Sequence, residues 1–323
     1  MHLLIKWYYW YKNLWDELII FSLLNRVDER FSPNRISIEC WDEQRLESWI
    51  IKHKSFLIPG IIEKLEFLPK PNRKEKIKIC LWMKRKSYDF IILWWWEVID
   101  ESRNFLYRWW NFFFQYRWSI KKWNTIIIGG LWTNNKRWTY FLQKFLIKNA
   151  KFIIIRDKTS YELAKNILIK AWLDRENRIE YDWDLSLPLL QEAHNIFIEN
   201  KISNKRNKYY LINMSPLCSK NPSLISIKKF ADSKKESQPI YIACNKLEDQ
   251  DFYKNIIDIL PQCEIFDWTQ SNILEILKLF YCCQWWIWAR LHFLFILKIF
   301  DKQFIKIHNS HKIEANLSDL NNE

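Results

Sequence analysis

Arg290 and His292 are the residues best suited to anion binding and to proton donation in this sequence. They follow the stretch CCQWWIW and lie at the start of an apolar run that ends at residue 300. The guanidinium of arginine is a fixed cation that binds carboxylate or phosphate, and histidine donates a proton near neutral pH. A histidine in an apolar helix is more commonly a core residue, but the arginine two positions earlier favours a functional interpretation.

Three other stretches place polar residues where an apolar, strand-like run ends. IIIRDKTS ends with Arg156 and Ser160, and IILWWWE ends with Glu97. An arginine at a strand end can bind an anion through two parallel hydrogen bonds, or it can pair with a neighbouring acid. Glu97 can contact a substrate hydroxyl or act as a base, or it can cap the next helix. In YDWDLSL, Asp182 and Asp184 are turn formers as readily as functional groups.

The opening stretch, LLIKWYYWYKNLWDEL, leads from a strand-like run into a helix-like one. Asn13 and Asp16 lie at that junction, where a helix N-terminus favours anions and negatively charged side chains. Asp16 is either a site residue or a plain N-cap, and the spacing matches neither a Walker loop nor GxGxxG.

Tryptophan and glycine are used in unusual numbers. The chain of 323 residues has 21 Trp and only 3 Gly, where about 23 glycines are typical of that length. The tryptophans cluster in loop-like stretches such as LWWWE and QWWIWAR. We interpret many of them as glycines of a gene that reads UGA as glycine, since they fall where backbone freedom is wanted. The alternative is a truly Trp-rich protein with aromatic platforms for sugars or bases.

The hydrophobic pattern alternates between strands and helices along the whole chain. Continuous apolar runs such as FIIIR are typical of parallel strands that are covered on both faces. We therefore predict two doubly wound, Rossmann-like α/β domains that face a cleft. Residues 1–190 form the first domain, the polar stretch 191–207 a linker, and 208–323 the second domain.

Composition narrows the functional classes. The net charge of +13 fits an anionic small molecule, a phospholipid surface or a nucleic acid. The seven cysteines lack CxxC or Cys/His spacing, which predicts free thiols and no metal site. No apolar run approaches the ~20 residues of a membrane span, and the N-terminus lacks signal-peptide features. A cytoplasmic protein is expected, peripheral at the inner membrane face if its acceptor is lipid-linked.

With tryptophan read as glycine, the chain resembles the polysaccharide pyruvyl transferases over nearly its whole length. The matching motifs occur in family order: G-Y-Y-G-x-x-N-L-G-D-E at 7–17, GGGE at 94–97, R-D-x-x-S at 156–160, an Asp-containing strand end at 181–187 and R-L-H at 290–292. As printed, the sequence departs from the family at these glycines.

The resemblance implies a glycosyltransferase-B-like fold and the transfer of pyruvate from phosphoenolpyruvate to a sugar as a ketal. By its match to R-L-H, His292 would be the general acid. Arg290 and Arg156 would bind the donor. Asp16 or Glu97 would orient or deprotonate an acceptor hydroxyl. Asn13 and Ser160 are substrate-binding candidates through their motifs, and no cofactor is required.

Two other functions fit the sequence. One is a glycosyltransferase of the same architecture that uses a nucleotide sugar. The other is a basic, aromatic nucleic-acid-binding protein, which requires the tryptophans to be real. Under the pyruvyl transferase interpretation the partners are phosphoenolpyruvate and a glycan acceptor, and no nucleic acid is expected.

Overall fold

The computed structural model describes most of the two predicted domains. The described residues are 1–7, 13–69, 88–95, 125–129, 144–155, 158–171, 178–182, 186–202, 208–214, 221–245, 249, 251–288 and 293–306.

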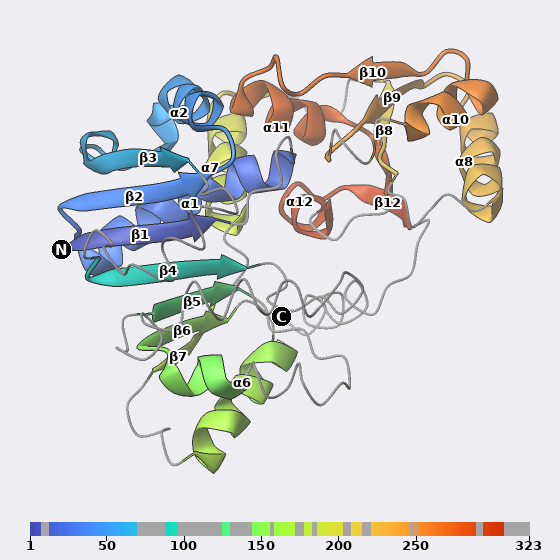
Figure 1. Ribbon diagram of the computed structural model, residues 1–323. Helices are drawn as coiled ribbons and strands as arrows, with labels where there is room; N and C mark the ends of the chain where they lie inside the picture. The colour runs from blue at the N-terminus through green and yellow to red at the C-terminus, as the bar shows by residue number, and fades with distance from the viewer. Residues whose placement is uncertain are drawn as a thin grey trace. The chain divides into compact units, whose positions relative to one another are not determined.

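The first unit is built on a parallel sheet with the order β3-β2-β1-β4-β5-β6-β7 among the described strands (Figure 1). Its strands are β1 (His2–Trp7), β2 (Arg35–Cys40), β3 (Leu65–Pro69), β4 (Phe90–Trp95), β5 (Thr125–Gly129), β6 (Phe152–Ile155) and β7 (Ile179–Tyr181). Its helices are α2 (Glu43–Lys52), α6 (Lys158–Lys170), the short η1 (Lys54–Phe56) and η2 (Ile62–Lys64), and a helical segment over 144–149. Strand order reverses between β1 and β4.

The second unit repeats this design with a five-stranded parallel sheet of order β10-β9-β8-β11-β12. Its strands are β8 (Tyr209–Ile212), β9 (Gln238–Ile242), β10 (Glu264–Phe266), β11 (Trp285–Trp288) and β12 (Gln303–Lys306). Its helices are α7 (Ser186–Glu199), α8 (Asn221–Ser233), α10 (Phe252–Ile259), α11 (Ile273–Cys282) and α12 (Phe293–Ile299). Here strand order reverses between β8 and β11.

The cores explain why the strands are continuously apolar. Ile91, Ile92 and Leu93 of β4 are each at most 3% exposed, as are Leu211 and Ile212 of β8. Side chains on both faces of these strands are therefore covered, as parallel sheets require. The predicted α/β class with two parallel sheets is confirmed.

Helix α1 (Leu14–Phe31) is divided between the two units. Contacts assign residues 1–9 and 24–184 to the first unit and residues 10–23 and 185–323 to the second. The sequence analysis predicts that the chain passes from the first domain to the second once, at a linker. The structure differs, because the first half of α1 packs with the C-terminal elements. Local pattern predicts the helix but not which core its two halves join.

The predicted linker at 191–207 is wrong over its first part. Residues 186–199 form α7, whose buried residues Leu189, Leu190, Ala193 and Phe197 recur at helical spacing. This face packs on α11 and α12 within the second unit. The polar residues that suggested a linker are the outer face of an amphipathic helix.

The prediction of a glycine loop at WWIW is wrong, because these four residues form strand β11. It pairs with β8 on one side and with β12 on the other, and Trp286 and Ile287 are fully buried. A run of four apolar residues between the capped helix α11 and the next helix suits a central strand of a parallel sheet. Strands β3 and β12 were likewise not anticipated.

The described cysteines are buried free thiols. Burial raises the pKa of Cys40 and of Cys263 to about 12 each. For Cys40, burial is the main cause of this raised pKa, and the nearby acids, led by Glu43, contribute to it because they disfavour another negative charge.

We expect Cys40 and Cys263 to remain unmodified by iodoacetamide at pH 8 in the folded protein. Only the thiolate reacts, and a pKa about four units above the pH leaves roughly one thiol in 10⁴ ionised. Peptide mass spectrometry after timed labelling measures this, with protein unfolded in urea as the control that labels both. Rapid labelling of either residue in the folded protein would contradict the burial.

Candidate functional site

Five sequence motifs have the same relation to the two sheets, since each begins at or directly after the carboxyl end of a parallel strand. The opening motif follows β1 and the WWWE motif begins within the end of β4, so these two border the reversal point of the first sheet. The segments with Arg156 and Asp182 follow β6 and β7, and the R-L-H segment follows β11 at the reversal point of the second sheet. Doubly wound sheets bind ligands outside these edges.

Four of the predicted site residues lie outside the described residues. They are Glu97, Arg156, Arg290 and His292. The structure describes the strands that precede them, and their roles stay predictions.

Asn13 caps helix α1 and ties it to the second sheet. Its side-chain oxygen accepts from the backbone N–H of Trp15 at 3.2 Å, and its backbone pairs with Asn245 in an isolated antiparallel bridge. The N–H of Leu14 donates to the carbonyl oxygen of Cys244 at 2.8 Å. Asn13, rather than Asp16, therefore fills the capping role that the sequence left open for Asp16.

Asp16 lies in the first turn of α1 and, like its neighbour Glu17, is fully buried. An acid in the first helical turn is stabilised by the backbone N–H groups and the helix dipole. Asp16 therefore lies one helical turn from Asn13 and within the protein interior. Its proposed contact with an acceptor hydroxyl stays a prediction.

Ser160, the other described candidate, lies in the first turn of α6 and is only 2% exposed. Ser160 belongs to the first unit, and Asn13 and Asp16 belong to the second. Its substrate-binding role stays a prediction.

Asn213, which the sequence analysis did not single out, crosses the reversal point of the second sheet. It directly follows β8, and its N–H donates to the carbonyl oxygen of Ile287 in β11 at 2.9 Å. Its side-chain amide donates to the carbonyl oxygen of Ile242 in β9 at 2.8 Å. Asn213 is fully buried and links β8, β9 and β11 at the carboxyl edge of the sheet. The signal in the sequence is a lone amide directly after the apolar run YYLI.

Lys6 and Glu39 form an ion pair that the sequence analysis did not indicate. Their side chains lie 3.0 Å apart, with 5% and 14% of their surface exposed. The residues are cross-strand partners on β1 and β2. Since β1 borders the reversal point of the first sheet, this ion pair lies close to the edge where the opening motif begins.

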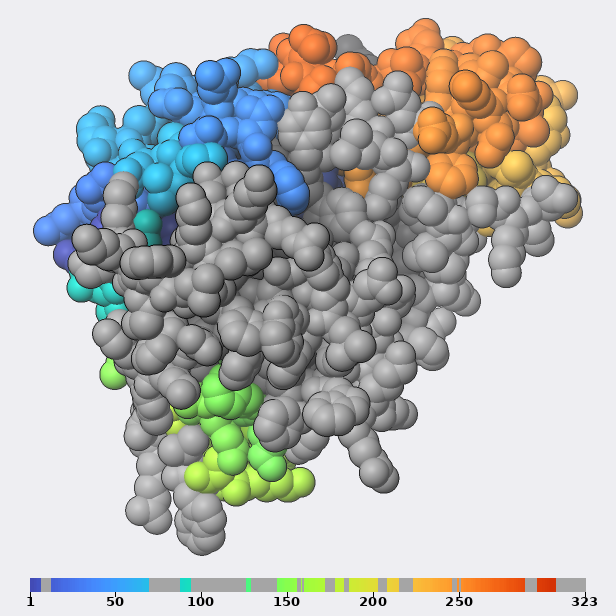
Figure 2. Space-filling view, viewed as in Figure 1, coloured from blue at the N-terminus to red at the C-terminus, as the bar shows by residue number. Residues whose placement is uncertain are grey.

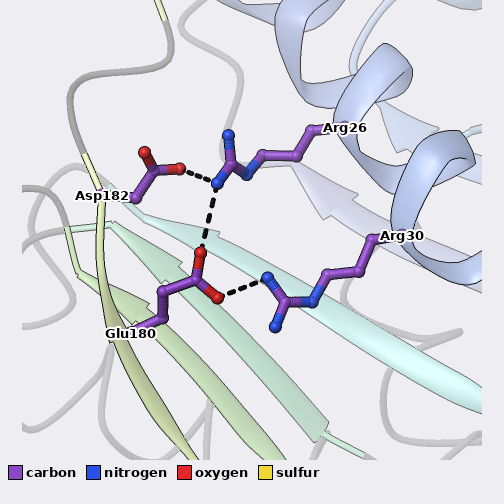
Figure 3. Close-up of polar contacts among 4 residues, drawn as sticks. All are labelled: Arg26, Arg30, Glu180 and Asp182. Atoms are coloured by element: carbon purple, nitrogen blue, oxygen red, sulfur yellow. Dashed lines mark hydrogen bonds and ion pairs between the residues drawn. The ribbon is translucent and has the colours of Figure 1, made fainter.

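Asp182, the strand-end acid after β7, belongs to an ion-pair network with helix α1 (Figure 3). Its carboxylate pairs with Arg26, and Glu180 accepts from Arg26 at 3.4 Å and from Arg30 at 2.5 Å. The guanidinium carbon of Arg30 also lies 3.9 Å from the ring centroid of Phe152. Asp182 therefore anchors α1 to the edge of the first sheet.

We expect Asp182→Asn to lower the free energy of unfolding by about 1 kcal/mol without changing turnover, because the pair is partly solvent-exposed. Urea unfolding measures the first effect and steady-state kinetics the second. Asp232→Asn is the matched control, since the Asp232–Lys228 pair is more exposed. A loss of turnover in Asp182→Asn with stability unchanged would instead make Asp182 a site residue.

The described tryptophans do not occupy backbone conformations that require glycine. The non-glycine residues with positive φ in the described part are Ser32, Lys201 and Asp301. Trp41, the residue directly after β2, is 61% exposed. The α2 region, which follows it in the sequence, forms part of the visible surface in Figure 2 (blue). Trp268 is 1% exposed, and its indole N–H donates to the carbonyl oxygen of Ala243 at 2.8 Å. The recoded-codon hypothesis stays a prediction.

Two searches of the described residues bear on metals and membranes. No group of three or more His, Cys, Asp or Glu side chains within them could hold a metal ion. No helix among them is long and apolar enough to cross a membrane.

Comparison of whole folds identifies similar solved structures. UDP-GlcNAc 2-epimerase from Neisseria meningitidis, solved with UDP-GlcNAc bound, matches 98% of this chain and 85% of its own, with a TM-score of 0.61 and 10% identity. The UDP-GlcNAc 2-epimerase of Methanocaldococcus jannaschii matches 98% of this chain and 87% of its own (TM-score 0.57, 13% identity). A glycosyltransferase from Rickettsia africae matches 99% of this chain and 87% of its own (TM-score 0.50, 9% identity). The fold is glycosyltransferase-B-like.

The sequence comparisons add no family. No protein-family model matches the chain, and no curated protein matches it. At 9–13% identity, the structural likenesses establish the fold alone.

Proposed function

We propose that this protein transfers a pyruvyl group from phosphoenolpyruvate to a sugar of a cell-wall or surface polysaccharide, forming a ketal. The observation that carries the proposal is the coincidence of motif and topology. All five motifs that resemble those of the polysaccharide pyruvyl transferases begin at or directly after carboxyl ends of parallel strands, and three of them border reversal points. That is the edge at which doubly wound sheets bind ligands.

The proposed chemistry begins with the donor. His292 gives a proton to the methylene carbon of the enol, so that the adjacent carbon becomes an oxocarbenium-like centre. A sugar hydroxyl oxygen bonds to that centre and loses its proton to Asp16 or Glu97. The bond from the same carbon to the phosphate oxygen breaks, and phosphate leaves. A second sugar hydroxyl then bonds to the carbon and loses its proton to His292, which closes the ketal and restores the acid.

In this proposal the two arginines bind the donor and take no part in proton transfer. Arg290 and Arg156 bind the carboxylate and phosphate of the donor, which guanidinium groups contact in a bidentate manner. Binding both ends of phosphoenolpyruvate would fix its methylene carbon relative to His292, so the reacting atoms start close together. The basic net charge favours such an anionic donor.

The alternative is a glycosyltransferase that uses a nucleotide sugar. The structural comparisons support this alternative more directly than pyruvyl transfer, because the Neisseria meningitidis epimerase was solved with UDP-GlcNAc bound and the Rickettsia africae protein is named a glycosyltransferase. A glycosyltransferase-B-like fold is, however, also what the pyruvyl transferase resemblance implies. The fold therefore leaves the donor to be decided by experiment.

The deciding experiment follows the leaving group. The protein is incubated with a cell-wall polysaccharide fraction and either phosphoenolpyruvate or UDP-GlcNAc, and released phosphate and UDP are measured. We expect phosphate release from phosphoenolpyruvate and a pyruvyl ketal on the glycan by mass spectrometry. UDP release without phosphate release would overturn the proposal in favour of the alternative. The chain is tested as printed and with glycine at the tryptophan positions of the motifs.

A further inference from the structure

Two segments far apart in the sequence meet where helix α1 begins. Asn13 and Asn245 form an antiparallel bridge, and the N–H of Leu14 donates to the carbonyl oxygen of Cys244 at 2.8 Å. All four residues belong to the second unit. The turn that follows β9 is therefore the support on which the start of α1 rests.

Asp249 stabilises that turn through two hydrogen bonds to Asn245. Its carboxylate oxygen Oδ2 accepts from the N–H of Asn245 at 2.9 Å, and its own N–H donates to the carbonyl oxygen of Asn245 at 2.8 Å. The hydroxyl of Tyr241 donates to the carbonyl oxygen of Asp249 at 2.6 Å. Asp249 and Tyr241 are fully buried, and Asn245 is 3% exposed. A hydrogen bond to a buried carboxylate is stronger than one between neutral groups.

The contacts form a chain that ends at a candidate site residue. Asp249 holds Asn245, Asn245 pairs with Asn13, and the carbonyl oxygen of Asn13 accepts from the N–H of Glu17 at 3.2 Å in the first turn of α1. Asp16 lies in that same turn. A displacement of the turn after β9 would therefore displace the first turn of α1, and with it Asp16.

We propose that Asp249 is a positioning residue that fixes Asn13 and Asp16 through Asn245. It does not touch substrate itself. The inference about catalysis rests on the proposed function, because only that function gives Asp16 a task. The inference about the contacts does not depend on any activity.

The test compares Asp249→Ala with Asp249→Asn. Alanine removes the acceptor of the Asn245 N–H, whereas the amide oxygen of asparagine can still accept it. Asp232→Ala is the control for loss of an acid in the same unit, since Asp232 is exposed and pairs only at the surface with Lys228.

Hydrogen exchange with mass spectrometry measures the protection of the amides that form these contacts. In Asp249→Ala we expect the amides of Leu14 and Asn245 to exchange about tenfold faster, with those of β1 and β2 unchanged. Asp249→Asn and Asp232→Ala should leave them as in the unaltered protein. Unchanged exchange at Leu14 and Asn245 in Asp249→Ala would overturn the inference.

Kinetics separate positioning from general destabilisation. We expect Asp249→Ala to lower kcat about tenfold or more with the KM for phosphoenolpyruvate unchanged, and Asp249→Asn to restore most of it. Faster exchange with unaltered kcat would overturn the positioning role. If the unaltered protein does not turn over phosphoenolpyruvate, the proposed function fails, while the exchange experiment still decides the contacts.

Discussion

Replacing His292 with alanine is expected to lower kcat for pyruvyl transfer by about 10²–10⁴-fold, the usual contribution of a general acid. The enol carbon of phosphoenolpyruvate is a weak base, so its protonation needs an acid close to it with a pKa near the working pH. Histidine is the only residue of the R-L-H motif that can supply that proton. Its segment follows β11, which borders the reversal point of the second sheet.

Two further variants test whether the loss of kcat is specific to His292. Arg290→Ala should mainly raise the KM for phosphoenolpyruvate, because it removes an anion contact and leaves the acid in place. His311→Ala is the matched control, as His311 lies in the polar stretch HNSHK to which no role is assigned. Circular dichroism checks that each variant folds. Near-normal turnover by a folded His292→Ala protein would remove His292 from the mechanism.

Replacing Trp15 with glycine is expected to destabilise the chain as printed by about 4 kcal/mol, as for other large-to-small changes of buried aromatic residues. Trp15 is 1% exposed and stacks on Phe280 with ring centroids 6.5 Å apart. Phe280 in turn meets the fully buried Trp286 at 4.9 Å. Glycine at position 15 would leave a cavity beside the Phe280 ring and would weaken the first turn of α1.

Urea unfolding measures this change, with Trp41→Gly as the control. Trp41 is 61% exposed, so its replacement should alter stability by no more than about 0.5 kcal/mol. The recoded-codon hypothesis predicts the opposite sign at position 15, because glycine would then be the native residue. A Trp15→Gly protein that is more stable than the printed chain would therefore support recoding. Mass spectrometry of peptides from the native host decides the residue itself.

Much of the local structure could be predicted from the sequence, because it depends on short-range patterns. FIII and YYLI are continuous apolar runs, and they form β6 and β8. Within NILEILKLF, Asn272 and Glu275 form the reciprocal capping box at the start of α11. These elements needed no knowledge of distant partners.

Errors arose where a residue's environment depends on distant segments. The polar side of α7 suggested a linker, since its apolar face is recognisable only against α11 and α12. WWIW was read as a loop, although its pairing with β8 and β12 makes it a central strand. The sequence does not distinguish a turn-forming role of Asp182 from a functional one. Its partner Arg26 lies on a helix more than 150 residues earlier in the chain.

The sequence by itself determined the α/β class and the order of the motifs, because hydrophobic periodicity and residue spacing are properties of neighbouring residues. Only the tertiary structure decided which strands border the reversal points, that α1 is divided between two units, and that Asp249 and Asn245 support its first turn. Those features depend on pairing and burial between segments that are remote in the chain. No local pattern specifies such pairings, since they are selected by the packing of the whole core.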